Sequence, residues 1–174
     1  MRGQGIAPPP HPRFSIFVLS LTDMISRSLW LVAALAPALL GSGAGLTGAA
    51  PPEFRSALTN APLDLALRPG DQLSEGLKQF YASGRNPYVG RAEALARGKE
   101  LYEEICQACH MPDGSGRIGP SLIDDLYINP RANTDVGMFE ILFGGAFGAM
   151  RSVYDRMSQD EMLKVLAYVR TLKK

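Results

Sequence analysis

The chain has 174 residues, with 18 basic and 17 acidic side chains and a net charge of +1. This balance lacks the strongly basic character that is typical of nucleic-acid-binding proteins, so we expect no nucleic-acid partner. The length is enough for one domain with a modest core.

Residues 1–49 show the order of features of a secretory signal segment. Arg27 precedes an apolar run over residues 29–40, and small residues follow as far as Ala50. We expect cleavage just before Ala50 and export to the periplasm, and Met24 would make a more ordinary start for such a signal. The apolar run is short for a membrane span, so an uncleaved anchor is the alternative.

The segment from residue 50 to residue 90 is expected to be an N-terminal arm that carries one short helix. Residues 50–72 are rich in proline and weakly patterned, which favours an extended chain with turns. A helix is predicted over residues 74–82, with Ser74 as its N-cap.

A longer helix is predicted from Arg91 to Ile105, where apolar side chains recur at roughly helical spacing. It runs directly into a pair of cysteines and can carry them at its C-terminal end. Gly98 lies inside this helix, where glycine costs about 1 kcal/mol relative to alanine. We expect Gly98 to permit close contact with another helix, and a glycine that is merely tolerated is the alternative.

The sequence C-Q-A-C-H at residues 106–110 has the attachment signature of a c-type heme. Cys106 and Cys109 can form thioethers with the two vinyl groups of the porphyrin, and His110 follows at once as a ligand to iron. The motif therefore predicts one covalent heme c. Heme of this type is attached outside the cytoplasm, in agreement with the predicted export.

Other interpretations of the two cysteines have less support. A dithiol redox site calls for a nearby βαβ pattern, and none is visible. A zinc site needs four ligands, and two cysteines with one histidine leave it one short. A structural disulfide between Cys106 and Cys109 is the remaining alternative.

Two further helices are predicted in the C-terminal part of the chain. The first runs over residues 135–143, with Asn133 or Thr134 as its cap and a pair of glycines at its end. The second follows a capping box at residues 158–161. Since no stretch shows the alternation of apolar and polar residues that is typical of a β-strand, we expect an all-α fold.

An electron-transfer heme usually has a second axial ligand, and methionine in that position raises the reduction potential. After removal of residues 1–49, His110 is the only histidine, which excludes bis-histidine ligation within one chain. Met150 follows a loop of small residues that can approach a flat porphyrin, and it is the preferred candidate. Met157 and an open sixth position are the alternatives.

The chain resembles class I c-type cytochromes and, within that class, cytochrome cL, over most of residues 60–174. The block that ends in Met150 is much more specific than the heme motif alone. The segments that carry the resemblance are A-P-L-D-L at 61–65, G-R-N-P-Y at 84–88, G-K-E-L-Y-E-E at 98–104, G-R-I-G-P-S-L at 116–122, F-E-I-L-F-G-G-A-F-G-A-M at 139–150 and D-E-M-L-K-V-L-A-Y-V-R at 160–170.

The resemblance implies a class I fold, with helices wrapped around one heme and residues 91–174 as the heme domain. It makes Cys106 and Cys109 the thioether residues, His110 the proximal ligand and Met150 the distal ligand.

The resemblance also implies a partner for the ligand histidine. It places a Gly-Pro pair, Gly119 and Pro120, beside that histidine, with the proline carbonyl accepting the Nδ1 proton. It further implies that the first helix crosses the last one near Gly98 and Tyr102 on one side and Ala167-Tyr168 on the other.

The function implied by the resemblance is that of a periplasmic, non-catalytic carrier of single electrons. Its donor would be a methanol dehydrogenase that depends on pyrroloquinoline quinone (PQQ), and its acceptor a smaller cytochrome c or an oxidase. A general cytochrome c that serves an oxidase or another dehydrogenase is the alternative. We expect a monomer. A heme peroxidase or gas-binding protein would need an open iron site, which Met150 argues against.

Two expectations concern the edge of the heme. Members of the family often have a tryptophan that helps to hold a propionate, but this chain has L-Y-I-N at residues 126–129, so Tyr127 or Asn129 is expected to substitute. Ile118, Phe147 and Ala149 are candidates for an exposed apolar patch, with a core position as the alternative for Phe147.

Overall fold

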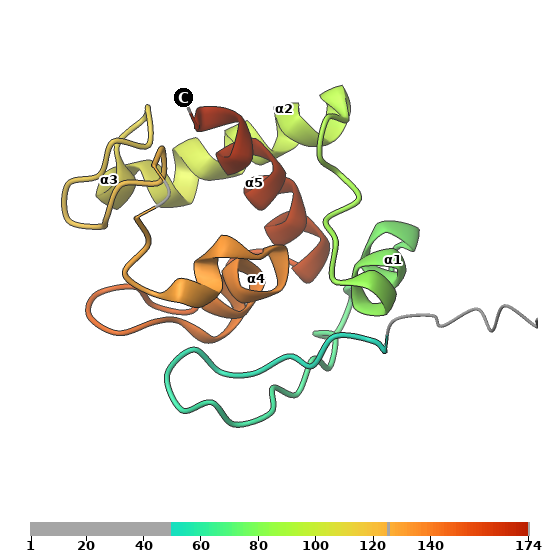
Figure 1. The fold of residues 1–174 in the computed structure, drawn as a ribbon. Helices are drawn as coiled ribbons and strands as arrows, with labels where there is room; N and C mark the ends of the chain where they lie inside the picture. Colours follow the sequence, from blue (N-terminus) through green and yellow to red (C-terminus); the bar gives the residue numbers. More distant parts are fainter. Residues whose placement is uncertain (1–49, 125, 174) are drawn as a thin grey trace, which may run out of the picture. The chain divides into compact units, whose positions relative to one another are not determined.

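The computed structural model describes residues 50–124 and 126–173, and the expected signal segment 1–49 lies outside them. The described residues form helices joined by loops, as Figure 1 shows. Among them there is one isolated β-bridge, between Arg55 and Pro62, and no strand. The all-α expectation is therefore confirmed. In this described part, none of the helices combines the length and hydropathy that a membrane crossing requires.

The helical elements follow one another from α1 to α5, with a π-helix and a 3-10 helix between them. The side chains of Ser74, Thr134 and Ser158 each accept a hydrogen bond from the backbone N–H three residues further on, which confirms these three N-caps. The bounds are α1 Glu75–Ser83, α2 Ala92–Leu101, the π-helix η1 Tyr102–Cys106, α3 Gln107–His110, the 3-10 helix η2 Pro130–Asn133, α4 Asp135–Gly144 and α5 Gln159–Leu172.

Helices α2 and α5 form the most extensive contact between elements in the described part of the chain. They cross at Gly98, where an added Cβ would lie 2.1 Å from the carbonyl oxygen of Lys164. Beside the crossing, the rings of Tyr102 and Tyr168 lie 5.5 Å apart. Gly98 therefore permits a close approach of two backbones, as expected from the sequence, and an alanine would force the helices apart.

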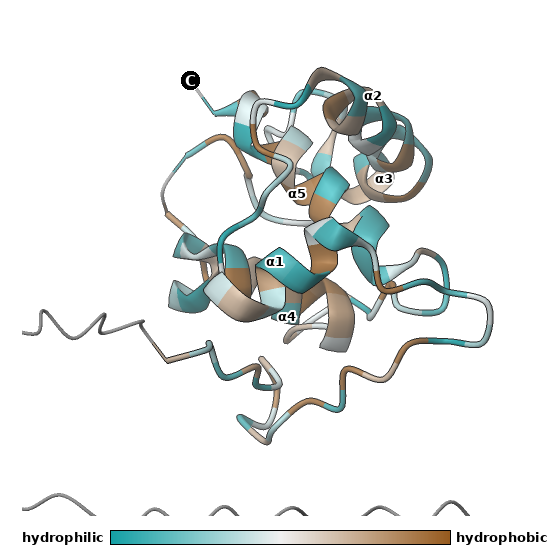
Figure 2. Ribbon diagram, turned by 90° about the vertical axis from the view of Figure 1, so that its right-hand side faces the viewer, coloured by the Kyte–Doolittle hydropathy of each residue, from teal (hydrophilic) through white to brown (hydrophobic). Residues whose placement is uncertain are grey.

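Helix α4 lies in the interior, and its hydropathy shows this (Figure 2). Its residues are mostly hydrophobic, whereas α1, α2 and α5 alternate between hydrophilic and hydrophobic along their length. A helix that is apolar around most of its circumference is typical of a buried position. Six of its residues are buried, among them Met138, Phe139 and Leu142.

Glu140 is the charged exception within α4, because its side chain is fully buried. Arg131 of η2 pairs with its carboxylate, with Nε donating over 2.6 Å, and the backbone N–H of Arg55 donates to the same carboxylate over 2.5 Å. A buried carboxylate requires such partners. Glu140 thus joins η2 and the N-terminal arm to α4, a connection that the sequence did not reveal.

The N-terminal arm packs against the helices through Phe54. Its ring lies 5.5 Å from that of Phe80, 5.7 Å from that of Tyr81 and 5.8 Å from that of Phe139. A turn follows at residues 56–61, which is closed by backbone hydrogen bonds between Ser56 and both Asn60 and Ala61.

Candidate functional site

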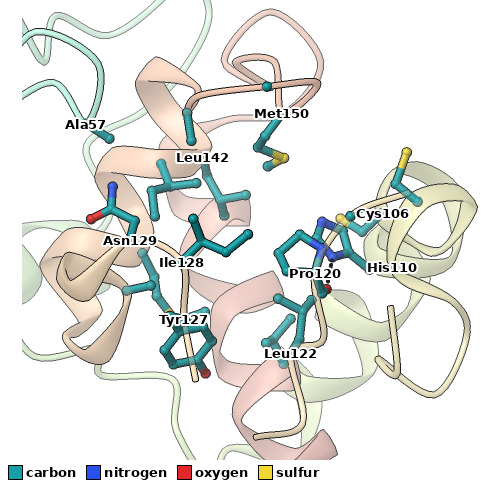
Figure 3. A pocket seen from close by; sticks show the side chains of 18 of the residues that line it. Ala57, Cys106, His110, Pro120, Leu122, Tyr127, Ile128, Asn129, Leu142 and Met150 are labelled. Carbon is teal, nitrogen blue, oxygen red and sulfur yellow. Dashed lines mark hydrogen bonds between the residues drawn. The ribbon is translucent and has the colours of Figure 1, made fainter. Parts of the chain in front are cut away.

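A cavity of about 600 Å³ lies between α3, the loop over residues 118–130, α4 and α5. This volume falls within the ordinary range of ligand sites. None of the described residues that line it is an aspartate, glutamate, lysine or arginine. Figure 3 shows the side chains of His110 and Met150 reaching into this space from different segments. An apolar cavity of this kind suits a large, flat and mostly hydrophobic group.

The heme-attachment motif forms one wall of the cavity. Helix α2 continues through the π-helix η1 into α3, and this helical chain presents Cys106, Cys109 and His110 to the cavity. Neither cysteine forms a disulfide. Burial raises the pKa of the Cys106 thiol to about 11, against a weaker lowering by Arg156. The nucleophilic cysteine of a dithiol oxidoreductase has a lowered pKa instead, so this site does not support a redox role for the thiols.

His110 is held in a single orientation. Its side chain is buried, and Nδ1 lies 2.9 Å from the carbonyl oxygen of Pro120. Because a carbonyl oxygen can only accept, Nδ1 is the donor in this bond, and the neutral tautomer that carries its proton on Nδ1 has a lone pair on Nε2. Gly119 passes against the face of the ring, where a side chain would collide with it. A neutral imidazole fixed by a second hydrogen bond is typical of a metal ligand.

Met150 belongs to a loop over residues 145–157, which we call the Met150 loop. Its start is shaped by Gly145 and Gly148, which have φ values of 80° and 86°. The N–H of Ala146 donates to the carbonyl of Met150 over 2.9 Å, which closes the loop on itself. Met150 lines the cavity. The small residues before it therefore allow a tight loop at the cavity wall, as the sequence suggested.

The competing methionines occupy other places. Met157 is 1% exposed and belongs to the hydrophobic core, outside the cavity lining. Met138 of α4 is also buried, and it does line the cavity. The described methionines in the lining are thus Met138 and Met150, and of these only Met150 lies on a loop.

Tyr127 and Asn129 line the cavity from the loop segment that leads to η2. The hydroxyl of Tyr127 is buried and has no hydrogen-bond partner. An unpartnered buried hydroxyl is unfavourable by about 1–3 kcal/mol. The Oδ1 of Asn129 accepts from the N–H of Arg131 over 3.0 Å, which fixes the side chain as the cap of η2. Tyr127 therefore leaves one buried hydroxyl without a partner beside the cavity.

The residues present fit a covalent heme c. Two free cysteines and a histidine with an available Nε2 stand on one wall, and a glycine leaves room beside the histidine ring. The lining is otherwise apolar, with an unpaired hydroxyl at Tyr127. Among the described residues, no group of three or more histidine, cysteine or acidic side chains is placed to hold a metal ion.

The mouth of the cavity is apolar and exposed. Ile118 is 63% exposed and Phe147 is 77% exposed, and both line the cavity together with the exposed Ala149. Phe147 is therefore a surface residue, and the alternative that it belongs to the core is wrong. We call Ile118, Phe147 and Ala149 the apolar rim.

Comparison with known proteins places these features in a family. Residues 93–169 match the family model described as cytochrome c oxidase, cbb3-type, subunit III. The chain is 34% identical to cytochrome c-L of Methylorubrum extorquens strain AM1 over 120 residues, which are 68% of this chain and 61% of that relative. The match thus spans less than two thirds of the relative's length.

Two crystal structures of cytochrome cL resemble the structure of this chain. That from the marine methylotroph Methylophaga aminisulfidivorans has a TM-score of 0.68 and 34% identity, with 70% of this chain and 81% of that chain covered. That from Hyphomicrobium denitrificans also has a TM-score of 0.68, with 37% identity and coverage of 72% and 76%. These similarities confirm the class I cytochrome fold that the sequence implied.

Proposed function

The chain belongs to the cytochrome cL family of class I c-type cytochromes, and from that premise we propose that it is a periplasmic carrier of single electrons and not an enzyme. The observation that carries this proposal is the apolar cavity, with the C-x-x-C-H motif on one wall and Met150 on another. The heme supplies an iron that alternates between two oxidation states, so that one electron is held at a time. The predicted signal segment, residues 1–49, supports export to the periplasm.

We assign a role to each residue at the site. Cys106 and Cys109 hold the heme as thioethers, and His110 is the proximal ligand. Pro120 fixes the tautomer of His110 through the hydrogen bond at Nδ1. Met150 is the distal ligand, supported by its place in the cavity wall and by the core position of Met157. A methionine ligand favours a raised reduction potential and leaves no open site for peroxidase chemistry.

The donor that we propose is a PQQ-dependent methanol dehydrogenase, and the acceptor is a smaller cytochrome c or an oxidase. The similarity to cytochrome cL from methylotrophic bacteria supports this assignment. A general cytochrome c that serves another dehydrogenase would have a similar cavity and is the second candidate. The protein would act as a monomer.

The apolar rim is the proposed route of electron entry. A transient redox complex needs only a small interface, and exposed apolar side chains at the mouth of the cavity allow close, water-free contact with a donor. Because the sequence is close to neutral in net charge, electrostatic steering should be moderate and should weaken as salt rises.

The test is stopped-flow reduction of the oxidised protein by purified methanol dehydrogenase over a salt series. The dedicated acceptor should be reduced faster than a generic small cytochrome c, and Phe147→Ala should slow the reaction without changing the heme spectrum. Val89→Ala is a matched control, since Val89 is 55% exposed and is not part of the cavity lining. If the generic cytochrome is faster at every salt concentration, the general-carrier assignment replaces this one.

A further inference from the structure

We propose that the N-terminal arm is a positioning element for Met150, and that Arg68 and Tyr154 are the residues through which it acts. The part of the arm that precedes α1, residues 50–73, would hold the Met150 loop against the cavity and keep the sixth position of the iron closed. This inference rests on the proposed function, because it takes Met150 to be the distal ligand.

Tyr154 connects the arm to the Met150 loop. It lies four residues after Met150, and its hydroxyl donates to the carbonyl of Ala66 in the arm over 2.5 Å. Its ring packs on Phe143 of α4, with the centroids 4.5 Å apart. Ser152 reinforces this anchor, because its hydroxyl donates to the carbonyl of Phe143 over 2.5 Å and accepts from the N–H of Tyr154. The C-terminal half of the loop is therefore tied to both α4 and the arm.

Arg68 is the second connection between the same two segments. Its Nη1 donates to the carbonyl of Tyr154 over 2.7 Å, and its guanidinium lies 5.6 Å from the centre of the Tyr154 ring. Asp71 orients the guanidinium with two bonds of 2.9 and 3.1 Å. These bonds also raise the pKa of Arg68, so the donor stays charged. A hydrogen bond from a charged donor is roughly twice as strong as a neutral one.

The arm itself is anchored independently of the Met150 loop. Gln159 at the start of α5 donates to the carbonyls of Leu65 and Ala66 over 3.0 and 3.3 Å. Nearer the start of the arm, the Arg55 N–H bonds to buried Glu140, and Phe54 packs against the hydrophobic core. An element fixed at both ends can restrain a loop that contains Gly145 and Gly148 and has little stiffness of its own.

The turn of the arm also reaches the cavity. Ala57 lines it, and the neighbouring Leu58 shares a surface groove with Met150 and Tyr154. The arm thus holds the Met150 loop by the hydrogen bonds of Arg68 and Tyr154 and borders the same groove at Leu58. If the loop moves away from the cavity, these hydrogen bonds must be disturbed, so the arm stabilises the closed arrangement over an open one.

The experiment measures how readily imidazole replaces the sulfur ligand in the full-length ferric protein. Loss of the weak sulfur-to-iron charge-transfer absorption reports the replacement. The apparent affinity for an incoming ligand scales with the open fraction of the protein. Arg68→Gln should raise this affinity about tenfold, the equivalent of one charged hydrogen bond. Arg68→Lys keeps one donor for the Tyr154 carbonyl and should lie between the parent and Arg68→Gln.

Tyr154→Phe removes one hydroxyl and keeps the ring on Phe143, so it should fold even if Arg68→Gln does not. We expect a gain in imidazole affinity of about threefold, the equivalent of one neutral hydrogen bond. Arg97→Gln is the matched control. Arg97 bonds to Glu100 and Glu161 and takes no part in the arm or the Met150 loop, so its loss should leave imidazole binding unchanged.

Met150→Ala separates this inference from the proposed function. If Met150→Ala opens the iron but the Arg68 and Tyr154 variants bind imidazole no better than Arg97→Gln, the arm has no positioning role and the ligand assignment stands. If Met150→Ala binds imidazole no better than the parent, the ligand assignment is wrong and the positioning role is overturned with it.

Discussion

Gly119 lies so close to the imidazole of His110 that a Cβ added to it would come within 2.5 Å of Cε1. The ring cannot easily move aside, because its Nδ1 is bonded to the carbonyl of Pro120, the next residue. The backbone of residues 119–120 therefore supports the ligand histidine in two ways, by contact and by hydrogen bonding.

Gly119→Ala should displace the His110 ring and weaken the ligation of the iron. Forcing a methyl group into such a contact costs about 1–3 kcal/mol. We expect a lowered yield of holoprotein and an altered heme absorption spectrum. Gly144→Ala is the control, since a Cβ there meets nothing closer than 3.6 Å and should leave the spectrum unchanged. An unaltered spectrum in Gly119→Ala would show that the ring is not confined at this position.

Covalent attachment is tested by replacing the cysteines. Extraction with acidified acetone should leave the pigment on the parent protein, because thioethers survive this treatment. In a double variant with Cys106→Ser and Cys109→Ser, any heme that binds should be extractable. Mass spectrometry of each single variant should show no more than one thioether, and two thioethers in either one would contradict the assignment.

The sixth ligand is tested by a pair of methionine variants. Met150→Ala should abolish the sulfur-to-iron charge-transfer band, lower the reduction potential and admit added ligands, because methionine ligation raises the potential. Met157→Ala should keep the band, yet lose about 2–5 kcal/mol of stability, because it empties a buried core position. The opposite pattern, with the band lost only in Met157→Ala, would make Met157 the ligand.

A pH dependence of stability is expected from Asp160 at the start of α5. Burial alone would raise the pKa of its carboxyl, but hydrogen bonds from Ser74 and Tyr88, together with Lys164 at 2.9 Å, lower it below its ordinary value. The stabilisation from a lowered carboxyl pKa is complete above the unfolded pKa and is lost as the pH falls through the folded one.

Asp160→Asn should therefore reduce the free energy of unfolding by about 2 kcal/mol at neutral pH, and by less below about pH 4. Urea unfolding curves at both pH values measure the difference. Asp64→Asn is the control, because Asp64 is exposed and an asparagine can keep its bond to the N–H of Ala66. An equal loss at both pH values would mean that the charge of Asp160 does not contribute.

The features that could be predicted from the sequence are those encoded within a few residues. The caps at Ser74, Thr134 and Ser158 depend on side chains that bond only three positions ahead, so local spacing is enough to find them. The heme motif is likewise local. Gly98 could be interpreted because glycine within a helical pattern already suggests that something approaches closely.

The features that were missed depend on partners far apart in the chain. Glu140 stands in an apolar run, and nothing nearby indicates that Arg55, 85 residues away, supplies one of its hydrogen bonds. In the same way, the place of Ala57 in the cavity wall follows from the path of the arm. A charged residue within an apolar helix is a signal that could have suggested a buried pair, but it does not identify the partner.

The π-helix η1, residues Tyr102–Cys106, lies between two parts of one helical chain that have different partners. Gly98 of α2 packs against α5, and His110 of α3 lines the cavity. A π-turn accommodates one additional residue within an α-helix, and such turns are frequent at functional sites. Deleting a single residue between Leu101 and Cys106 would thus remove the π-turn and leave α2 and α3 as one uninterrupted α-helix, with the heme motif at an ordinary helical end.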